Sequence, residues 1–191
     1  MNQLRIMYQK VSKEITLIFV MTTLLTVLSS VVVQLSYAQS NTDLENIMLK
    51  IHNDERDAVE VPPLTWSSSL AANAQSWANH LTTLGLICDP ARADLVPPKP
   101  ICDATPHGAK NENIAAGLAD FNSPDELALL WADEKEKYNA GQRSGPGIGH
   151  YTAMVWKNTQ EIGCGFASSG QMDFLVCRYN PPGNLPGQTP Y

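Results

Sequence analysis

The sequence predicts one domain of the α+β class, with helices in its first part and a β-hairpin near its end. Three segments between residues 42 and 139 carry apolar residues at helical spacing, and each starts at a Ser or Thr that can cap a helix. After His150, two short β-like runs flank a four-residue connection. With 191 residues, 43% hydrophobic and 17% charged, the chain can bury a core, which excludes a disordered protein.

Residues 1–38 predict export from the cytoplasm. Three basic residues precede an apolar run from Ile15 to Val33, and Ser36-Tyr37-Ala38 resembles a signal-peptidase site. We expect a signal peptide that is removed before Gln39, which leaves residues 39–191 as the folded domain. The alternative is an uncleaved anchor formed by residues 15–33, because an apolar run of this length can span a bilayer. In both cases the domain lies outside the cytoplasm.

Composition also excludes two classes of protein. The formal net charge is −6, and an acidic surface repels phosphate backbones, so no nucleic-acid partner is expected. No period of 20 to 50 residues recurs along the chain, which excludes repeat architectures.

The first two helices are predicted on either side of a Pro-Pro break. Thr42 and Glu45 form a capping-box pattern, so a helix should run from about Asp43 to Val59. Ser67 can cap a second helix that Gly85 would stop. One face of this second helix carries Leu70, Ala74, Trp77, Ala78 and Leu81.

The segment from Leu86 to Lys110 is predicted to be a long loop without regular structure. It contains five prolines, which cannot donate backbone hydrogen bonds. Cys88 and Cys102 lie within this loop, and a disulfide between them could cross-link it.

The third helix should begin at Ser123-Pro124-Asp125-Glu126 and end near Asn139. Ser can cap this helix, Pro suits its first position, and the Glu side chain can accept the backbone N–H of the capping Ser. Five of its residues point in one direction at 100° per residue: Leu127, Leu130, Trp131, Glu134 and Tyr138. Glu134 therefore faces inward, where a carboxylate needs a cation, a metal or a buried donor. The alternative is that Glu134 lies at the edge of the helix and reaches solvent.

The hairpin predicts the disulfides. Its runs, Gly163 to Ala167 and Asp173 to Tyr179, place Cys164 opposite Cys177, close enough for a bridge. By elimination Cys88 pairs with Cys102. Zinc ligation by the cysteines is the weaker alternative, because no pair has C-x-x-C spacing.

Two of the four histidines are candidates for a site. His80 is expected on the surface, and His52 is expected to be structural, together with Asn53 and Arg56. His107 lies in a loop five residues before Glu112, and His150 closes the glycine-rich loop that starts at Gly141.

These two imidazoles, with Glu112 and Glu134, would suit a divalent cation such as Zn²⁺ if they came together. They would equally suit a hydrogen-bonded polar core.

Several stretches together resemble the CAP superfamily of cysteine-rich secretory proteins, antigen 5 and plant pathogenesis-related proteins (the SCP domain). The resemblance covers about Leu44 to Tyr191. The segments that carry it are Ile51-His52-Asn53-Asp54-Glu55-Arg56, Leu64-Thr65-Trp66-Ser67, Glu112-Asn113-Ile114-Ala115, Trp131-Ala132-Asp133-Glu134, Gly149-His150-Tyr151-Thr152-Ala153-Met154-Val155-Trp156 and Val176-Cys177-Arg178-Tyr179-Asn180-Pro181-Pro182-Gly183-Asn184.

The resemblance implies a three-layer α-β-α sandwich with a small antiparallel sheet, and a short helix from His150 to Trp156. It also implies a cleft tetrad, which falls on His107, Glu112, Glu134 and His150 and which the family associates with divalent cations. Many members show no demonstrated catalysis, and several resemble sterol or lipid carriers.

Three positions depart from the family pattern. Gly108 stands where relatives often carry a Ser that has been proposed as a nucleophile, so a serine-hydrolase mechanism loses its nucleophile. Asn111 replaces a usual Gly and Ala153 a usual Gln, which alters the cleft rim.

We therefore expect a secreted binding protein whose cleft holds Zn²⁺, another divalent cation or a small polar ligand, and not an enzyme. The first alternative is a metal-dependent hydrolase in which Glu112 or Glu134 activates a metal-bound water. The second is an extracellular carrier of sterol or fatty acid.

Overall fold

The computed structural model describes residues 7, 21, 24–26, 28–32, 42–89, 101–102 and 105–191. The chain divides into two units, Met1–Asp43 and Leu44–Tyr191. Within the described residues, no helix is long and apolar enough to cross a membrane. Most of the predicted signal segment and its whole cleavage site lie outside the described residues, so export stays a prediction here.

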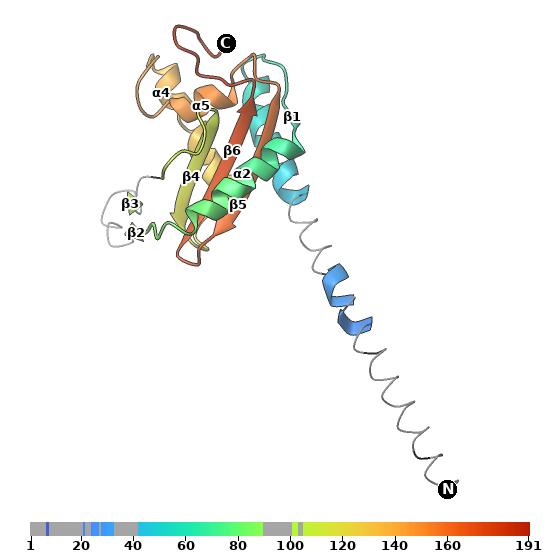
Figure 1. Cartoon of the computed structure of the whole chain (residues 1–191). Coiled ribbons are helices and arrows are strands. Elements are labelled where there is room, and N and C mark those ends of the chain that lie inside the picture. The colour runs from blue at the N-terminus through green and yellow to red at the C-terminus, as the bar shows by residue number, and fades with distance from the viewer. Residues whose placement is uncertain are drawn as a thin grey trace. The chain divides into compact units, whose positions relative to one another are not determined.

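The second unit is built on a four-stranded sheet with the order β1-β5-β6-β4 (Figure 1). Its strands are β1 (Thr65–Trp66), β4 (Glu112–Leu118), β5 (Glu161–Ser168) and β6 (Met172–Asn180). β5 and β6 form the predicted hairpin, and both β5–β6 and β4–β6 are antiparallel. The short β1 runs parallel to β5, so the sheet is mixed where an antiparallel one was expected.

The hairpin register confirms the first predicted bridge. Cys164 lies opposite Cys177, and the two are joined by a disulfide with a Cα–Cα distance of 4.1 Å. The register follows from the connection length, because a hairpin loop of defined length fixes which residues face each other.

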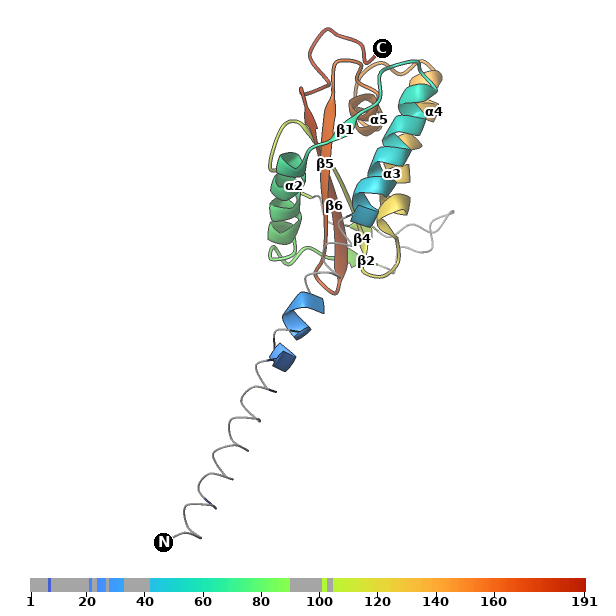
Figure 2. The ribbon, with the colours of Figure 1, turned by 90° about the vertical axis from the view of Figure 1, so that its right-hand side faces the viewer.

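Helices cover both faces of the sheet and form three layers (Figure 2). α2 (Ser68–Leu81) lies on one face. It approaches the sheet at Gly163 and Gly165, where an added Cβ would stand 2.2 Å from the Ala71 nitrogen and 2.3 Å from Gln75 backbone atoms. Only glycine allows this close contact between a helix and a strand.

The other face is covered by the helical residues 44–57 and by α3 (Pro124–Ala132), α4 (Lys135–Asn139) and α5 (Gly149–Met154) (Figure 2). α5 confirms the short helix that the family resemblance implies. Alternate residues of β6 serve the two cores: Leu175 and Tyr179 face the larger core with Trp131, while Phe174 and Val176 face the core under α2. This confirms the α-β-α sandwich.

Three helix predictions need correction. The first helix ends at residue 57 and is followed by turn residues 58–60. α2 ends at Leu81, four residues before Gly85, because a turn over residues 82–85 intervenes. The predicted third helix is two helices, α3 and α4, separated at Asp133-Glu134.

The start of α3 is as predicted, since the Ser123 backbone N–H donates to the Glu126 carboxylate at 2.9 Å. Leu127 and Trp131 are buried, but Leu130 is 44% exposed. Its predicted inward position was wrong, because Leu130 lies at the edge of the apolar stripe and the core takes only the centre.

The proline-rich loop contains a short ladder that the sequence did not predict. β2 (Cys88–Asp89) pairs with β3 (Ile101–Cys102), and Cys88 lies opposite Cys102. The prolines flank these strands and do not interrupt them. The backbone pairing fits the second predicted disulfide, whose side chains lie outside the described atoms, so that bridge stays a prediction.

Candidate functional site

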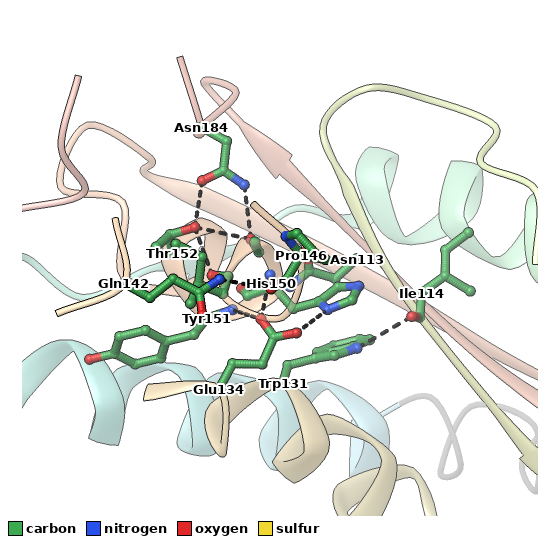
Figure 3. Close-up of polar contacts among 12 residues, drawn as sticks. Asn113, Ile114, Trp131, Glu134, Gln142, Pro146, His150, Tyr151, Thr152 and Asn184 are labelled. Atoms are coloured by element: carbon green, nitrogen blue, oxygen red, sulfur yellow. Dashed lines mark hydrogen bonds and ion pairs between the residues drawn. The ribbon is translucent and has the colours of Figure 1, made fainter. Parts of the chain in front are cut away.

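Glu134 lies in the break between α3 and α4 and points at the start of α5. Its Oε1 contacts His150 Nδ1 at 2.8 Å, and its Oε2 accepts the backbone N–H groups of His150 (2.8 Å) and Tyr151 (3.1 Å). Figure 3 shows this carboxylate aimed at the imidazole and the helix start. The inward orientation predicted for Glu134 is confirmed, and the donors that it needs come from α5.

The environment of Glu134 favours its charged form. Burial alone would raise the pKa of this carboxyl, but hydrogen bonds from the His150 ring and from two backbone N–H groups, with the attraction of His150, bring the pKa below its usual value. The lowered pKa makes Glu134 a weak proton acceptor near neutral pH, which does not suit a general base.

His150 is held between this carboxylate and an aromatic ring. The Trp131 indole stacks on the imidazole with 6.2 Å between ring centroids and 21° between planes. The His150 side chain is 38% exposed. Among the described residues, nothing hydrogen-bonds to its Nε2, so this nitrogen remains open to a ligand.

His107 and Glu112 form a second pair at the start of β4. His107 Nδ1 lies 3.3 Å from Glu112 Oε1, and the Glu112 side chain is fully buried while that of His107 is 55% exposed. Oε1 also accepts the N–H groups of Gly108 and Ala109, and Oε2 accepts Arg178 Nε at 3.0 Å. The carboxylate thus accepts three N–H groups and lies beside His107 Nδ1, so it has little capacity left for a metal.

Arg178 is the part of this pair that the sequence analysis missed. Glu112 and Arg178 are direct cross-strand neighbours on β4 and β6. Opposite charges at such positions attract each other. The signal was the register of β4 on β6, which a single sequence does not reveal.

Gly108 has a structural reason to replace the usual Ser. An added Cβ at this position would stand 2.5 Å from the Trp77 ring, and Trp77 donates from Nε1 to the Pro106 carbonyl at 3.2 Å. The indole occupies the space that a side chain at 108 needs.

Asn111, at the second altered position, donates to the Tyr179 carbonyl at 2.7 Å and accepts the Tyr179 N–H at 3.0 Å through its own carbonyl. It therefore ties the loop before β4 to β6. Ala153, at the third, is 7% exposed within α5.

A buried network lies beneath the site and contains His52. Because Met48 presents a carbonyl to His52 Nδ1 (2.7 Å), the ring donates there, and Nε2 accepts the Tyr179 hydroxyl at 2.9 Å. Asn113 donates to the same hydroxyl (2.9 Å) and to the His150 carbonyl (3.0 Å). Burial lowers the pKa of His52 to about 4. His52 is structural, as the sequence suggested.

Asn53 and Arg56 support the neighbouring chain segments. The Asn53 side chain exchanges two hydrogen bonds with the Leu64 backbone. Arg56 is buried and donates to the carbonyls of Pro62, Met154, Trp156 and Thr159. His80 is exposed, as expected.

The four candidate residues thus form two pairs, His107–Glu112 and Glu134–His150. Within the part of the chain that the structure describes, no three His, Cys, Asp or Glu side chains are grouped so that they could hold a metal ion. The donors do not fit a closed site of four protein ligands, because both carboxylates are occupied by N–H groups. The donors that the two pairs leave open are imidazole nitrogens, a common type of ligand for divalent cations.

Comparisons with known proteins identify the family. Residues 49–179 match the model of the cysteine-rich secretory protein family, CAP. The chain is 34% identical to pathogenesis-related protein 1B of Nicotiana tabacum over 160 residues, which cover 82% of this chain and 84% of the relative. It is 30% identical to pathogenesis-related protein 1 of Arabidopsis thaliana over 170 residues, 88% of this chain and 95% of the relative.

Solved structures agree on the fold. The crystal structure of hookworm platelet inhibitor aligns with a TM-score of 0.58 at 18% identity, over 78% of this chain and 75% of that one. NaASP2, solved with Zn²⁺, aligns with a TM-score of 0.54 at 18% identity, over 77% and 84%. The chain belongs to the CAP family of cysteine-rich secretory proteins, in its pathogenesis-related 1-like branch.

Proposed function

We propose that this chain is a secreted CAP-domain binding protein whose cleft binds a divalent cation, such as Zn²⁺, through the Nε2 atoms of His107 and His150. One observation carries the proposal: each imidazole has its Nδ1 beside a glutamate carboxylate and, among the described residues, its Nε2 open. Metal-binding histidines are typically oriented in this way, by a carboxylate on the second ring nitrogen.

Glu112 and Glu134 act here as positioning residues. Their carboxylates set the tautomer and orientation of the rings, while the cation, when bound, supplies a Lewis-acidic centre for an acceptor atom of a ligand. The crystal structure of NaASP2 with Zn²⁺ supports a cation in this fold.

The hydrolase alternative receives less support. A general base needs a free lone pair and a pKa near the working pH. Glu112 is buried and accepts three N–H groups, and the pKa of Glu134 is lowered. The contacts of the two His–Glu pairs do not favour a sterol or fatty-acid carrier.

Calorimetric titration with Zn²⁺ tests the proposal. We expect saturable binding that weakens as the pH falls, because protons compete for the imidazole nitrogens. His150→Ala should lower the affinity at least about tenfold by removing a ligand. A variant that binds as tightly as the wild type would contradict the cation site and leave a polar core.

Secretion is tested separately by the intact mass of protein recovered from the culture medium. A chain that starts at Gln39 supports the proposed signal peptide. Full-length protein found only in membranes would support the anchor over residues 15–33.

A further inference from the structure

A groove of about 440 Å³ is lined by residues of α4, α5 and the C-terminal segment. These elements lie near one end of the sheet (Figure 1). This volume lies within the range of small-molecule sites. Its walls are Tyr138, the loop residues 143–145, Ile148, Thr152, Trp156 and residues 184–190. Neither of the two His–Glu pairs contributes to the lining, so the groove is distinct from the proposed cation site.

Arg143 is the only charged side chain among the lining residues. Its Nη1 donates to the carbonyls of Tyr138 and Gln142, and its guanidinium lies over the Tyr138 ring, 4.4 Å from the centroid. Within the described part of the chain, its Nε and Nη2 have no hydrogen-bond partner. A fixed guanidinium whose Nε and Nη2 leave three N–H groups unused suits a carboxylate.

Trp156 contributes a second unused donor. The residue is 2% exposed, and its Nε1 is the one buried side-chain nitrogen or oxygen of the described residues without a hydrogen-bond partner. A buried donor left unpaired costs about 1–3 kcal/mol, so it calls for an acceptor. Trp156 also lines the groove, so its indole N–H can report on a ligand bound there.

The remaining wall is uncharged and combines apolar residues with polar ones such as Asn184 and Gln188. Ile148 and Trp156 are buried beneath it, Leu185 is 41% exposed at its side, and no Asp or Glu is among the lining residues. Because the chain as a whole carries a net charge of −6, a positive groove without a neutralising carboxylate is a local exception. The local charge favours an anionic ligand, and the apolar residues Ile148, Trp156 and Leu185 favour one with an apolar body.

We propose that this groove binds a small organic monocarboxylate with an apolar body. The carboxylate pairs with Arg143, and the apolar body packs against Ile148 and Trp156. The proposal does not depend on a cation in the His–Glu cleft, and either could hold without the other.

NMR titration with 3-phenylpropanoate tests the proposal. The indole N–H resonance of Trp156, assigned by its loss in Trp156→Phe, should shift saturably in the ¹H–¹⁵N spectrum. The neutral 3-phenylpropanamide should bind at least about tenfold more weakly, since it cannot form the charged pair with Arg143. Equal affinity for acid and amide, or no saturable shift, would overturn the proposal.

Variants of the groove provide the second arm. Arg143→Gln should lower the affinity for 3-phenylpropanoate at least about tenfold. Ser144→Trp, at an exposed lining residue, should block entry while it keeps the guanidinium. Lys50→Gln, at an exposed cation of the first helix that does not line the groove, is the charge-matched control and should bind the acid like the wild type. Unchanged binding in both groove variants would refute the site whatever the result for Zn²⁺.

Discussion

His52 and His150 both have a contact at Nδ1, but only His52 has a hydrogen-bond partner at Nε2 among the described residues. The Nε2 of His52 accepts the Tyr179 hydroxyl inside the core, where the residue is fully buried. The side chain of His150 is 38% exposed, and nothing among the described residues bonds to its Nε2. A histidine with both nitrogens satisfied serves the fold, whereas one with a nitrogen left open can serve a ligand.

The Nδ1 partners of the two histidines also differ, since one is a neutral carbonyl and the other is a carboxylate. His52 donates to the neutral carbonyl of Met48, and burial keeps the ring uncharged by lowering its pKa to about 4. His150 contacts the Glu134 carboxylate, which orients the ring. Asn113 links the two histidines, because it donates to the His150 carbonyl and to the Tyr179 hydroxyl that binds His52. His52 stabilises the fold, whereas His150 is proposed to bind a ligand.

The largest expected effect that separates them is on stability. His52→Ala should lower the free energy of unfolding by about 3 kcal/mol, because it leaves a cavity and an unpaired Tyr179 hydroxyl. His150→Ala should cost about 1 kcal/mol or less, since half-exposed side chains contribute little. Urea unfolding measures both, and equal losses would remove the distinction.

Acid should destabilise the protein through His52. The pKa falls from 6.5 in the unfolded chain to about 4 in the fold. The unfolded state therefore binds the proton more readily between these values. The His52 contribution is complete above pH 6.5 and is lost as the pH falls to 4, for a total of about 3 kcal/mol.

Urea unfolding of wild type and His52→Gln at a series of pH values measures this linkage. The variant lacks the titrating ring and should show a smaller slope between pH 6.5 and about 4. An identical slope would assign the acid sensitivity to other groups.

A smaller effect is expected at the carboxylate of the proposed cation site. Glu134→Gln should lower the Zn²⁺ affinity about tenfold, because an amide turns one acceptor oxygen into a donor and no longer orients His150. The exposed Glu136→Gln on α4 is the matched control and should bind Zn²⁺ like the wild type. If Glu134→Gln also binds normally, the carboxylate has only a structural role.

The smallest effect is expected at His80, whose ring lies 4.8 Å from that of Trp77 on the exposed side of α2. His80→Ala should leave the Zn²⁺ affinity unchanged and the stability within about 0.5 kcal/mol of the wild type. A clear loss of Zn²⁺ binding by His80→Ala in calorimetry would contradict a cation site at His107 and His150.

Local patterns of the sequence determined the elements of this protein. Ser123 and Glu126 mark the start of α3, and the four-residue connection between the two strands sets the hairpin register and with it the Cys164–Cys177 disulfide. The scarcity of histidine and the inward direction of Glu134 also singled out the four candidate residues. These inferences succeed because helix starts and hairpin pairings depend on residues that are close in the chain.

Only the tertiary structure decided how the four candidates pair. Glu134 meets His150 across 16 residues, and Glu112 meets Arg178 across 66. The break between α3 and α4, which frees Glu134 for the N–H groups of α5, has no signal in the periodicity of the helix. A single sequence records which donors and acceptors exist, but packing of distant segments decides which of them are satisfied and which nitrogen stays open.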